Sequence, residues 1–221
     1  MKRWVKIDSE RVPGAGTLEL LQGGDDFVIQ VDGVPLMSNR EHGSEDALAD
    51  LACEHLPADA SILVGGLGMG FTTARALARL GPAGRVVVAE LVPAVVRWNR
   101  GPAGSAAGHV LDDPRTELFE GDVADAIRSR PGVLDAVLLD VDNGPEALSH
   151  PGNRWLYGPG GLSACWKALR PGGVLGVWSV APDPAFTARM ERAGFAVTVV
   201  PVRSRGKKGN RHVIWVGRRP R

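Results

Sequence analysis

The stretch ILVGGLGMGFTTARAL, residues 62–77, decides how the rest of this sequence is interpreted. An apolar run typical of a buried strand ends in three glycines at alternate positions, Gly66, Gly68 and Gly70, and a helix-forming run follows at once. Glycine has no Cβ and tolerates positive φ, so such a turn lets a ligand lie on the backbone beside the unpaired N–H groups of a helix. A tight turn required only for packing is the alternative.

The spacing of the glycines narrows the choice of ligand. A dinucleotide fingerprint requires G-x-G-x-x-G, and Phe71 occupies the position of its third glycine. The observed G-x-G-x-G instead suits a nucleoside that carries an amino-acid-like tail. We therefore predict that Gly66, Gly68, Met69 and Gly70 bind such a cofactor.

Apolar runs of strand length alternate with helix signals after this turn. Helices are expected from Pro93, across 155–169, and from Asp183 to Gly194, where Pro184 lies in the first turn. Strand and helix in alternation predict a doubly wound, Rossmann-like α/β sheet. The expected strands that follow the glycine turn lie at 85–90, 116–121, 136–140 and 174–179.

The two ends of the chain depart from this alternation. Period-2 patterns before Ser38 predict a small β-meander, which we assign to a domain of residues 1–43, and a helix capped by Ser44 opens a second domain, 44–221. Residues 195–202 and 212–217 lack an intervening helix and are expected to pair as an antiparallel hairpin around a loop, 203–211. A sheet that ends in such a hairpin is typical of S-adenosylmethionine-dependent methyltransferases.

Acidic residues follow the next three strands of the predicted sheet. Glu90 lies where a carboxylate accepts hydrogen bonds from two ribose hydroxyls, and Asp122 lies where it accepts one from an adenine amino group. Asp140 ends the following strand. Glu90 and Asp122 could each serve only as a helix cap instead. Because open α/β sheets bind ligands at the carboxyl ends of their strands, the acids and the glycines together predict a nucleoside pocket.

Several motifs in this order resemble the spermidine synthase family. The resemblance covers residues 61–173, and the preceding meander matches that family's layout. It implies a methyltransferase-type Rossmann fold and binding of S-adenosylmethionine or its decarboxylated form by residues 66–70, Glu90 and Asp122. It also suggests a homodimer formed through the meander; the alternative is that the meander only covers the pocket. The motifs read GLGMGFTTARAL, VVVAEL, DDPRTELFEGDV, LDAVLLD and ALRPGG.

The sequence departs from that family at three places. Aminopropyl-transferring members carry an acid inside the glycine turn, where this chain has Met69. Asp140 matches the first acid of the catalytic segment, while the second falls on Asn143 or is displaced to Asp142. The tyrosine-containing pair expected after the meander is replaced by Glu45 and Asp46.

These departures lead to three hypotheses for function. A thioether cannot hold the primary amine of an aminopropyl group, so we expect an enzyme that transfers a methyl group from intact S-adenosylmethionine to a small acceptor, amine or anionic. The second hypothesis is a polyamine aminopropyltransferase that uses the decarboxylated donor, and the third is a non-catalytic nucleoside-binding module.

Transfer from a sulfonium needs an aligned lone pair and, for an ammonium acceptor, a base. Asp140 and Asp142 are the candidates, since repulsion between two acids raises the pKa of one of them. The alternative is that Asp142 only forms the turn before Gly144.

The family's active-site lid corresponds to the segment with His150, Trp155 and Tyr157. The aromatic rings of this segment could equally belong to the core. The basic segment 203–211 is either a solvated hairpin tip or an anchor for an anionic acceptor.

Composition excludes several other classes. A net charge of +1 provides no global field for nucleic acid or an anionic membrane, and no apolar run approaches the ~18–20 residues of a membrane span. Cys53 and Cys165 lack metal or disulfide-framework spacing, and His42 and His55 have no partner at metal spacing. We expect a cytoplasmic enzyme without a metal ion, nucleic-acid partner or membrane anchor.

Overall fold

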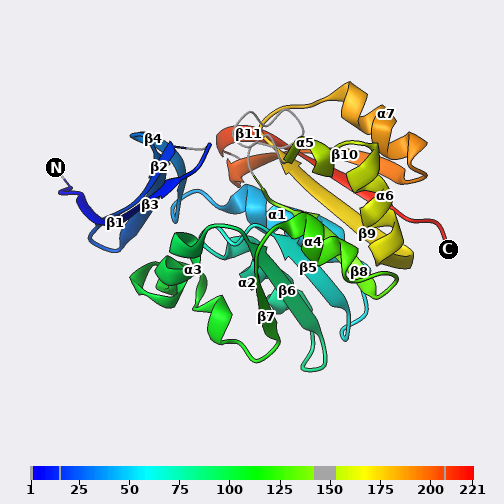
Figure 1. Cartoon of the computed structure of the whole chain (residues 1–221), viewed down its shortest axis with the longest axis horizontal. Coiled ribbons are helices and arrows are strands. Elements are labelled where there is room, and N and C mark those ends of the chain that lie inside the picture. Colours follow the sequence, from blue (N-terminus) through cyan, green and yellow to red (C-terminus); the bar gives the residue numbers. More distant parts are fainter. Residues whose placement is uncertain (1, 15, 142–152, 207) are drawn as a thin grey trace.

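Seven strands form the central sheet of the protein, in the order β10-β11-β9-β8-β5-β6-β7 (Figure 1). The computed structural model describes residues 2–14, 16–141, 153–206 and 208–221. Strands β5 to β9 are parallel, and β10 and β11 run antiparallel. The strands are β5 (Ser61–Gly65), β6 (Arg85–Glu90), β7 (Thr116–Glu120), β8 (Leu134–Leu139), β9 (Leu169–Ser179), β10 (Ala196–Arg205) and β11 (Lys208–Arg218).

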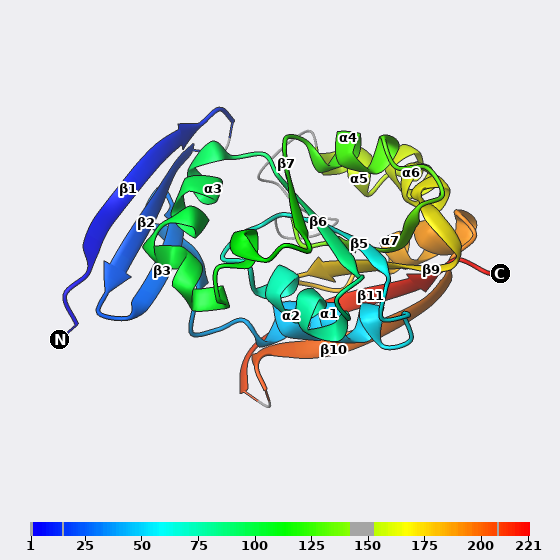
Figure 2. The same ribbon diagram turned by 90° about the horizontal axis from the view of Figure 1, so that it is seen from below.

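Helices cover both faces of this sheet, as the doubly wound pattern predicts (Figure 2). One face carries α1 (Gly43–Cys53), α2 (Phe71–Arg79) and α3 (Pro93–Arg100), and the other carries α4 (Val123–Arg128), α5 (Asn153–Leu156), α6 (Pro159–Ala168) and α7 (Pro184–Arg192). The central strands are apolar on both faces because both are covered. The sheet separates two hydrophobic clusters, which contain Ile62, Val64 and Leu138 on the α1 face and Leu63, Val137 and Leu139 on the other.

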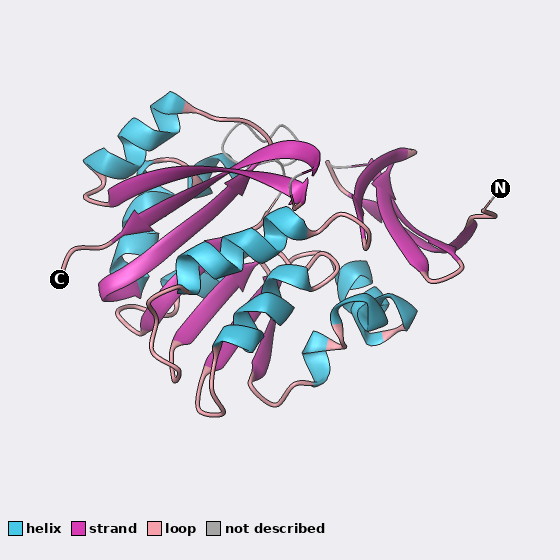
Figure 3. Ribbon diagram, turned by 180° about the vertical axis from the view of Figure 1, so that it is seen from behind, coloured by secondary structure: helices cyan, strands magenta, loops and turns pink. Residues whose placement is uncertain are grey.

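A second, four-stranded antiparallel sheet stands beside α3 (Figure 3). Its strands are β1 (Val5–Val12), β2 (Gly16–Gly23), β3 (Asp26–Val31) and β4 (Val34–Ser38). The meander prediction is confirmed, but β1 was not anticipated because its charged residues hide the alternation. The indole N–H of Trp98 on α3 donates to Asp8 of β1 at 2.8 Å, which ties the two parts together. The division into domains 1–43 and 44–221 and the homodimer stay predictions.

Two local predictions were wrong. The helix expected across 155–169 is two helices, because Gly158 is extended and Pro159, which lacks an N–H, starts α6. The basic loop expected at 203–211 is mostly strand, since the β10–β11 pairing continues to Arg205 and Lys208.

Two short helices were not expected, and one helix boundary was misplaced. Residues 102–107 form a 3-10 helix, η1 (Pro102–Ala107), that buries Gly104. A second, η2, spans Val110–Asp112. Helix α1 begins one residue before the predicted cap Ser44, whose hydroxyl donates instead to the carboxylate of Glu45 at 2.5 Å.

None of the helices in the described parts of the chain combines the length and the apolar character needed to span a bilayer.

Cys53 and Cys165 are both buried and free. Burial raises the pKa of each thiol to about 12. Both cysteines are therefore packing residues rather than nucleophiles.

The contact between α1 and the sheet depends on a glycine in β9. A Cβ atom on Gly176 would lie 3.0 Å from Leu48 Cδ1 and 3.2 Å from Ala52 Cβ, both on α1. We predict that Gly176→Val lowers the free energy of unfolding by about 1–3 kcal/mol, because overpacking moves α1 off the sheet. Urea denaturation measures the change. Adding Leu48→Ala to Gly176→Val should lower the free energy of unfolding by less than Leu48→Ala does in the wild type. If the two decreases simply add, the packing argument is contradicted.

Candidate active site at the carboxyl edge of the sheet

The carboxyl ends of β5, β6, β7 and β8 place the predicted residues side by side. The sheet's hydrogen bonding continues past the strands: Asp140 N donates to Gly65 O at 2.9 Å, and Gly66 N donates to Ala89 O at 2.9 Å. Gly121 N likewise donates to Glu90 O at 2.8 Å. The strand-end residues that the sequence singled out therefore lie along one edge.

The glycine turn between β5 and α2 requires glycine for conformational reasons. Gly66, Gly68 and Gly70 have φ values of +87°, +51° and +88°, a region that side chains disfavour. A Cβ atom on Gly66 would also lie 2.5 Å from the carbonyl oxygen of Asp140. At Gly68 the nearest atom to an added Cβ is Met37 Sδ of β4, at 3.2 Å, which is the end of a flexible side chain. The flexible side chain of Met37 therefore lies against the backbone of the turn at Gly68.

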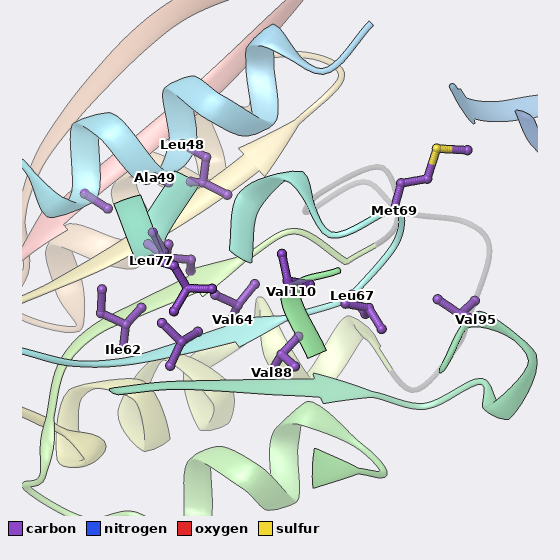
Figure 4. Packing of buried hydrophobic residues seen from close by; sticks show 14 of the residues in the cluster. Leu48, Ala49, Ile62, Val64, Leu67, Met69, Leu77, Val88, Val95 and Val110 are labelled. Atoms are coloured by element: carbon purple, nitrogen blue, oxygen red, sulfur yellow. The ribbon is translucent and has the colours of Figure 1, made fainter. Parts of the chain in front are cut away.

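Met69 fills the position of the family's acid with a buried thioether. Its side chain is only 2% exposed, and it belongs to the hydrophobic cluster on the α1 face. Figure 4 shows the thioether extending away from Leu67 and the strand, toward the antiparallel sheet. No charge is supplied by the turn itself.

Glu90 joins the glycine turn to helix α3. Its carboxylate accepts hydrogen bonds from Leu67 N at 3.0 Å and from Val92 N, the N-cap residue of α3, at 2.8 Å. Burial raises the pKa of this carboxyl, while the backbone donors act in the opposite direction. Hydrogen bonds from the backbone of Leu91 and Gly68 also lower this pKa, so the backbone of the turn and of the α3 start surrounds the carboxylate. The capping role is therefore observed, and the ribose-binding role stays a prediction.

Asp122 caps α4 with one carboxylate oxygen. Oδ1 accepts from Ala124 N at 2.8 Å. The carboxylate therefore has further acceptor capacity for an adenine amino group, which stays a prediction. The backbone of 66–70 and the two acids Glu90 and Asp122 lie at one edge of the sheet, and their binding of an S-adenosyl group stays a prediction.

Asp140 and Glu45 form an acidic pair beside the turn. Glu45 lies in the first turn of α1, and Asp140 follows β8 and accepts a hydrogen bond from Thr72 Oγ1 at 2.6 Å. Burial, and then repulsion by Glu45, raise the pKa of Asp140 to about 7. Burial also raises the pKa of Glu45. The expected neighbour of Asp140, Asp142, lies outside the described residues, and the described source of repulsion is Glu45.

Sequence reasoning missed two further residues at this edge. His42 had been given no role, yet its ring stacks on Phe71 at 4.1 Å between centroids and contacts Asp46 at 2.9 Å. Asn99 of α3 donates to the carbonyl of Gly68 at 2.8 Å and holds the turn from behind. A single histidine or asparagine carries no periodic signal, so only the tertiary structure could reveal these contacts.

The predicted lid residues have different environments. His150 lies outside the described residues. Tyr157 is 3% exposed, packs edge-on against Phe186, and donates to the Val141 carbonyl at 2.9 Å. The guanidinium of Arg128 lies 3.9 Å from the ring centroid of Trp155. The placement of Tyr157 corresponds to the core alternative, and its hydroxyl fixes the chain one residue beyond Asp140.

Within the described residues, no group of three or more His, Cys, Asp or Glu side chains is arranged to hold a metal ion. A hollow of about 630 Å³ lies at a different place, around Trp166, Lys167 and Arg219. It is near the start of β9, whereas the glycines and acids lie at the carboxyl edge. The candidate active site is therefore the carboxyl edge.

Comparison with solved structures identifies the fold as spermidine synthase-like. The chain superposes on spermidine synthase from Thermotoga maritima with a TM-score of 0.76 at 18% identity, over 96% of this chain and 72% of that one. A spermidine synthase in complex with the transition-state analogue AdoDATO gives 0.74 at 18% identity, with the same coverage. A probable spermidine synthase from Corynebacterium glutamicum ATCC 13032 gives 0.63 at 21% identity, over 97% and 79%.

The fold expected from the motifs is confirmed by these likenesses. No protein-family model matches the chain, and no curated protein matches it. At identities of 18–21%, the likeness establishes the architecture but not the chemistry. The residues of the carboxyl edge must therefore carry the functional argument.

The acidic pair makes stability depend on pH. The folded protein holds the Asp140 proton more tightly than the unfolded chain, so the free energy of unfolding decreases as pH rises from 3.8 to about 7. We predict that Glu45→Gln reduces this decrease, because one source of the raised pKa is removed. The matched control Glu54→Gln removes an exposed acid just beyond the end of α1 and should retain the slope. Urea denaturation across this pH range measures both variants, and parallel profiles for Glu45→Gln and wild type would refute the coupling.

Proposed function

We propose that this protein is a transferase that moves an aminopropyl group from decarboxylated S-adenosylmethionine to an amine acceptor. The observation that carries the proposal is the acidic pair, Asp140 and Glu45, placed beside a glycine turn suited to an S-adenosyl group. An acid with a pKa near neutrality can take a proton, and a second acid next to it attracts an ammonium group.

Each part of the carboxyl edge has a role in this proposal. The backbone of residues 66–70 would lie under the donor's tail, Glu90 would accept hydrogen bonds from the ribose, and Asp122 from the adenine. Asn99 holds the turn in place through the Gly68 carbonyl. These residues orient the donor and leave the acidic pair facing the acceptor.

The chemistry divides between the donor and the acidic pair. When bound, the sulfonium supplies an activated carbon, to which the acceptor nitrogen bonds while the C–S bond breaks and its electron pair returns to sulfur. Asp140 takes the proton that the acceptor nitrogen must lose, and Thr72 orients the carboxyl through its 2.6 Å hydrogen bond. Glu45 keeps the pKa of Asp140 high enough for this transfer and attracts the ammonium form.

The likeness to three spermidine synthase structures supports aminopropyl as the transferred group. One of those structures holds a transition-state analogue, and the same architecture extends over nearly all of this chain. Asp140 corresponds to the first acid of the family's catalytic segment. The acceptor would then be a small amine.

Methyl transfer from intact S-adenosylmethionine is the second candidate, and one observation favours it. Met69 buries a thioether where the resemblance implies an acid that holds the donor's primary amine. Without that acid, the preference for the decarboxylated donor has to come from the acidic pair, or it is absent. The identity of the preferred donor decides between the two candidates.

We predict that Asp140→Asn lowers kcat about 10²–10⁴-fold, because an amide cannot take the acceptor's proton. Affinity for methylthioadenosine, measured by calorimetry, should stay within about threefold, since the ribose and adenine contacts remain. Asp46→Asn serves as the matched control and should retain turnover. Unchanged turnover in Asp140→Asn, with nucleoside binding retained, would favour a non-catalytic nucleoside-binding module.

The transferred group is tested at Met69. Calorimetric titration with both donors should show tighter binding of the decarboxylated form if aminopropyl is transferred. We predict that Met69→Asp increases affinity for the decarboxylated donor about tenfold, because a carboxylate pairs with its primary amine. Met69→Leu, which keeps the apolar volume, should change neither affinity. Tighter binding of intact S-adenosylmethionine by the wild type would reject aminopropyl transfer and favour methyl transfer.

A further inference from the structure

The hollow near the start of β9 lies at the opposite end of the strands from the candidate active site. Its volume of about 630 Å³ falls within the range of about 300–1,000 Å³ that small-molecule pockets have. Its walls come from the turn before β8, the end of α6, the start of β9 and the residue after β11, near the point marked C in Figure 1. We call it the amino-edge hollow. Its walls include Pro131, Trp166, Lys167, Leu169, Pro171 and Arg219.

The charged side chains that line the amino-edge hollow are both positive. They are Lys167 and Arg219, and no acid is among the described residues that line it. Neither forms an ion pair within the described parts of the chain. Asp135, near the start of β8, is already engaged, because its Oδ2 accepts from Ser61 N at 2.8 Å and from Arg170 Nη1 at 2.5 Å. A negative group in the hollow therefore meets two cations that no described acid neutralises.

The guanidinium of Arg219 is held in place by the walls of the hollow. Its Nη1 donates to the carbonyl oxygens of Trp166 at 2.7 Å and of Leu169 at 2.6 Å. The guanidinium carbon lies over the Trp166 ring, 5.0 Å from its centroid. The N–H groups on Nη2 and Nε have no partner among the described residues. Because this planar group is already fixed, its remaining N–H groups can bind a carboxylate or phosphate with little loss of conformational freedom.

The rest of the amino-edge hollow is apolar, with one aromatic ring. Trp166 is half-buried, and its ring packs edge-on against Phe195 with centroids 5.1 Å apart. No hydrogen bond within the described residues uses its indole N–H, and that nitrogen is not buried. Pro131 and Pro171 add exposed apolar surface beside the ring. A ligand that matches these walls has a flat apolar body as well as a negative group.

We propose that the amino-edge hollow binds a small ligand that carries a carboxylate or a phosphate on a flat apolar body. The negative group is bound by the remaining N–H groups of Arg219 and by the ammonium group of Lys167, and the apolar body lies against Trp166 and Pro171. Binding here makes and breaks no covalent bond. The inference does not depend on the proposed transfer reaction, because the whole length of β9 separates the hollow from the carboxyl edge.

Four naphthalene compounds that differ in one group test the charge of the ligand. 1-Naphthoate and 1-naphthyl phosphate are anions, 1-naphthalenemethanol is neutral, and 1-naphthylmethylamine is a cation at neutral pH. Each is titrated into ¹⁵N-labelled protein. The indole N–H signal of Trp166, assigned by its loss in Trp166→Phe, reports binding at the amino-edge hollow.

We expect at least one of the two anions to shift the Trp166 signal and to bind tenfold or more tightly than the alcohol. Which anion binds better decides between carboxylate and phosphate, and either preference supports the site. Equal or tighter binding of the alcohol or the amine would overturn the proposal. So would the absence of any shift at Trp166 with both anions.

Removal of one cation tests which residues bind the negative group. Lys167→Gln should weaken binding of the anions about threefold to fivefold and leave binding of the alcohol unchanged. The matched control Lys208→Gln removes an exposed lysine at the β10–β11 hairpin and should change no affinity, although it alters the net charge equally. Thermal denaturation should show both variants as stable as the wild type, since neither lysine forms an ion pair within the described residues. Wild-type affinity for the anions in Lys167→Gln, or equal losses in both variants, would refute the assignment.

Discussion

The buried carboxylate of Glu90 is the contact on which the carboxyl edge depends. It accepts a hydrogen bond from the glycine turn through Leu67 N and another from the start of α3 through Val92 N. A buried acid needs such donors, because each unmet acceptor costs free energy. The same contacts fix where α3 begins, and α3 carries both Asn99, which holds the turn, and Trp98, which anchors the antiparallel sheet. One side chain therefore links ligand geometry to the placement of two structural units.

The chemistry of the edge follows from its unequal charge distribution. Acids gather at the ends of β6, β7 and β8, and Glu45 adds a further one from α1. A buried acid next to another acid has a pKa near neutrality, so it can take up a proton from an amine there. Met69 leaves the glycine turn itself without a charge. The charge of this edge therefore comes from the strand-end acids and Glu45.

Much of the fold was predictable, because the signals were local. Apolar runs bounded by glycine and proline predicted five parallel strands, and the absence of a helix between two late runs predicted the hairpin. Failures occurred where the tertiary structure overrode local composition. Residues 101–108 look like a loop but form η1 against α3, and charged β1 forms a strand because β2 offers it an edge. Pro159 marks the start of a new helix, but the helical periodicity on both sides of it concealed this break in the sequence.

Spacing within short segments already located the glycines at 66, 68 and 70 and the acids at the ends of three strands. The partners of those acids depend on how the folded chain brings distant residues together. Glu45 meets Asp140 across 95 residues, and Trp178 meets His212 across 34, because α1 packs over the sheet and β11 returns beside β9. Pattern and propensity act over a few residues, whereas charge coupling, stacking and unmet hydrogen bonds act through space, so they appear only once the chain is folded.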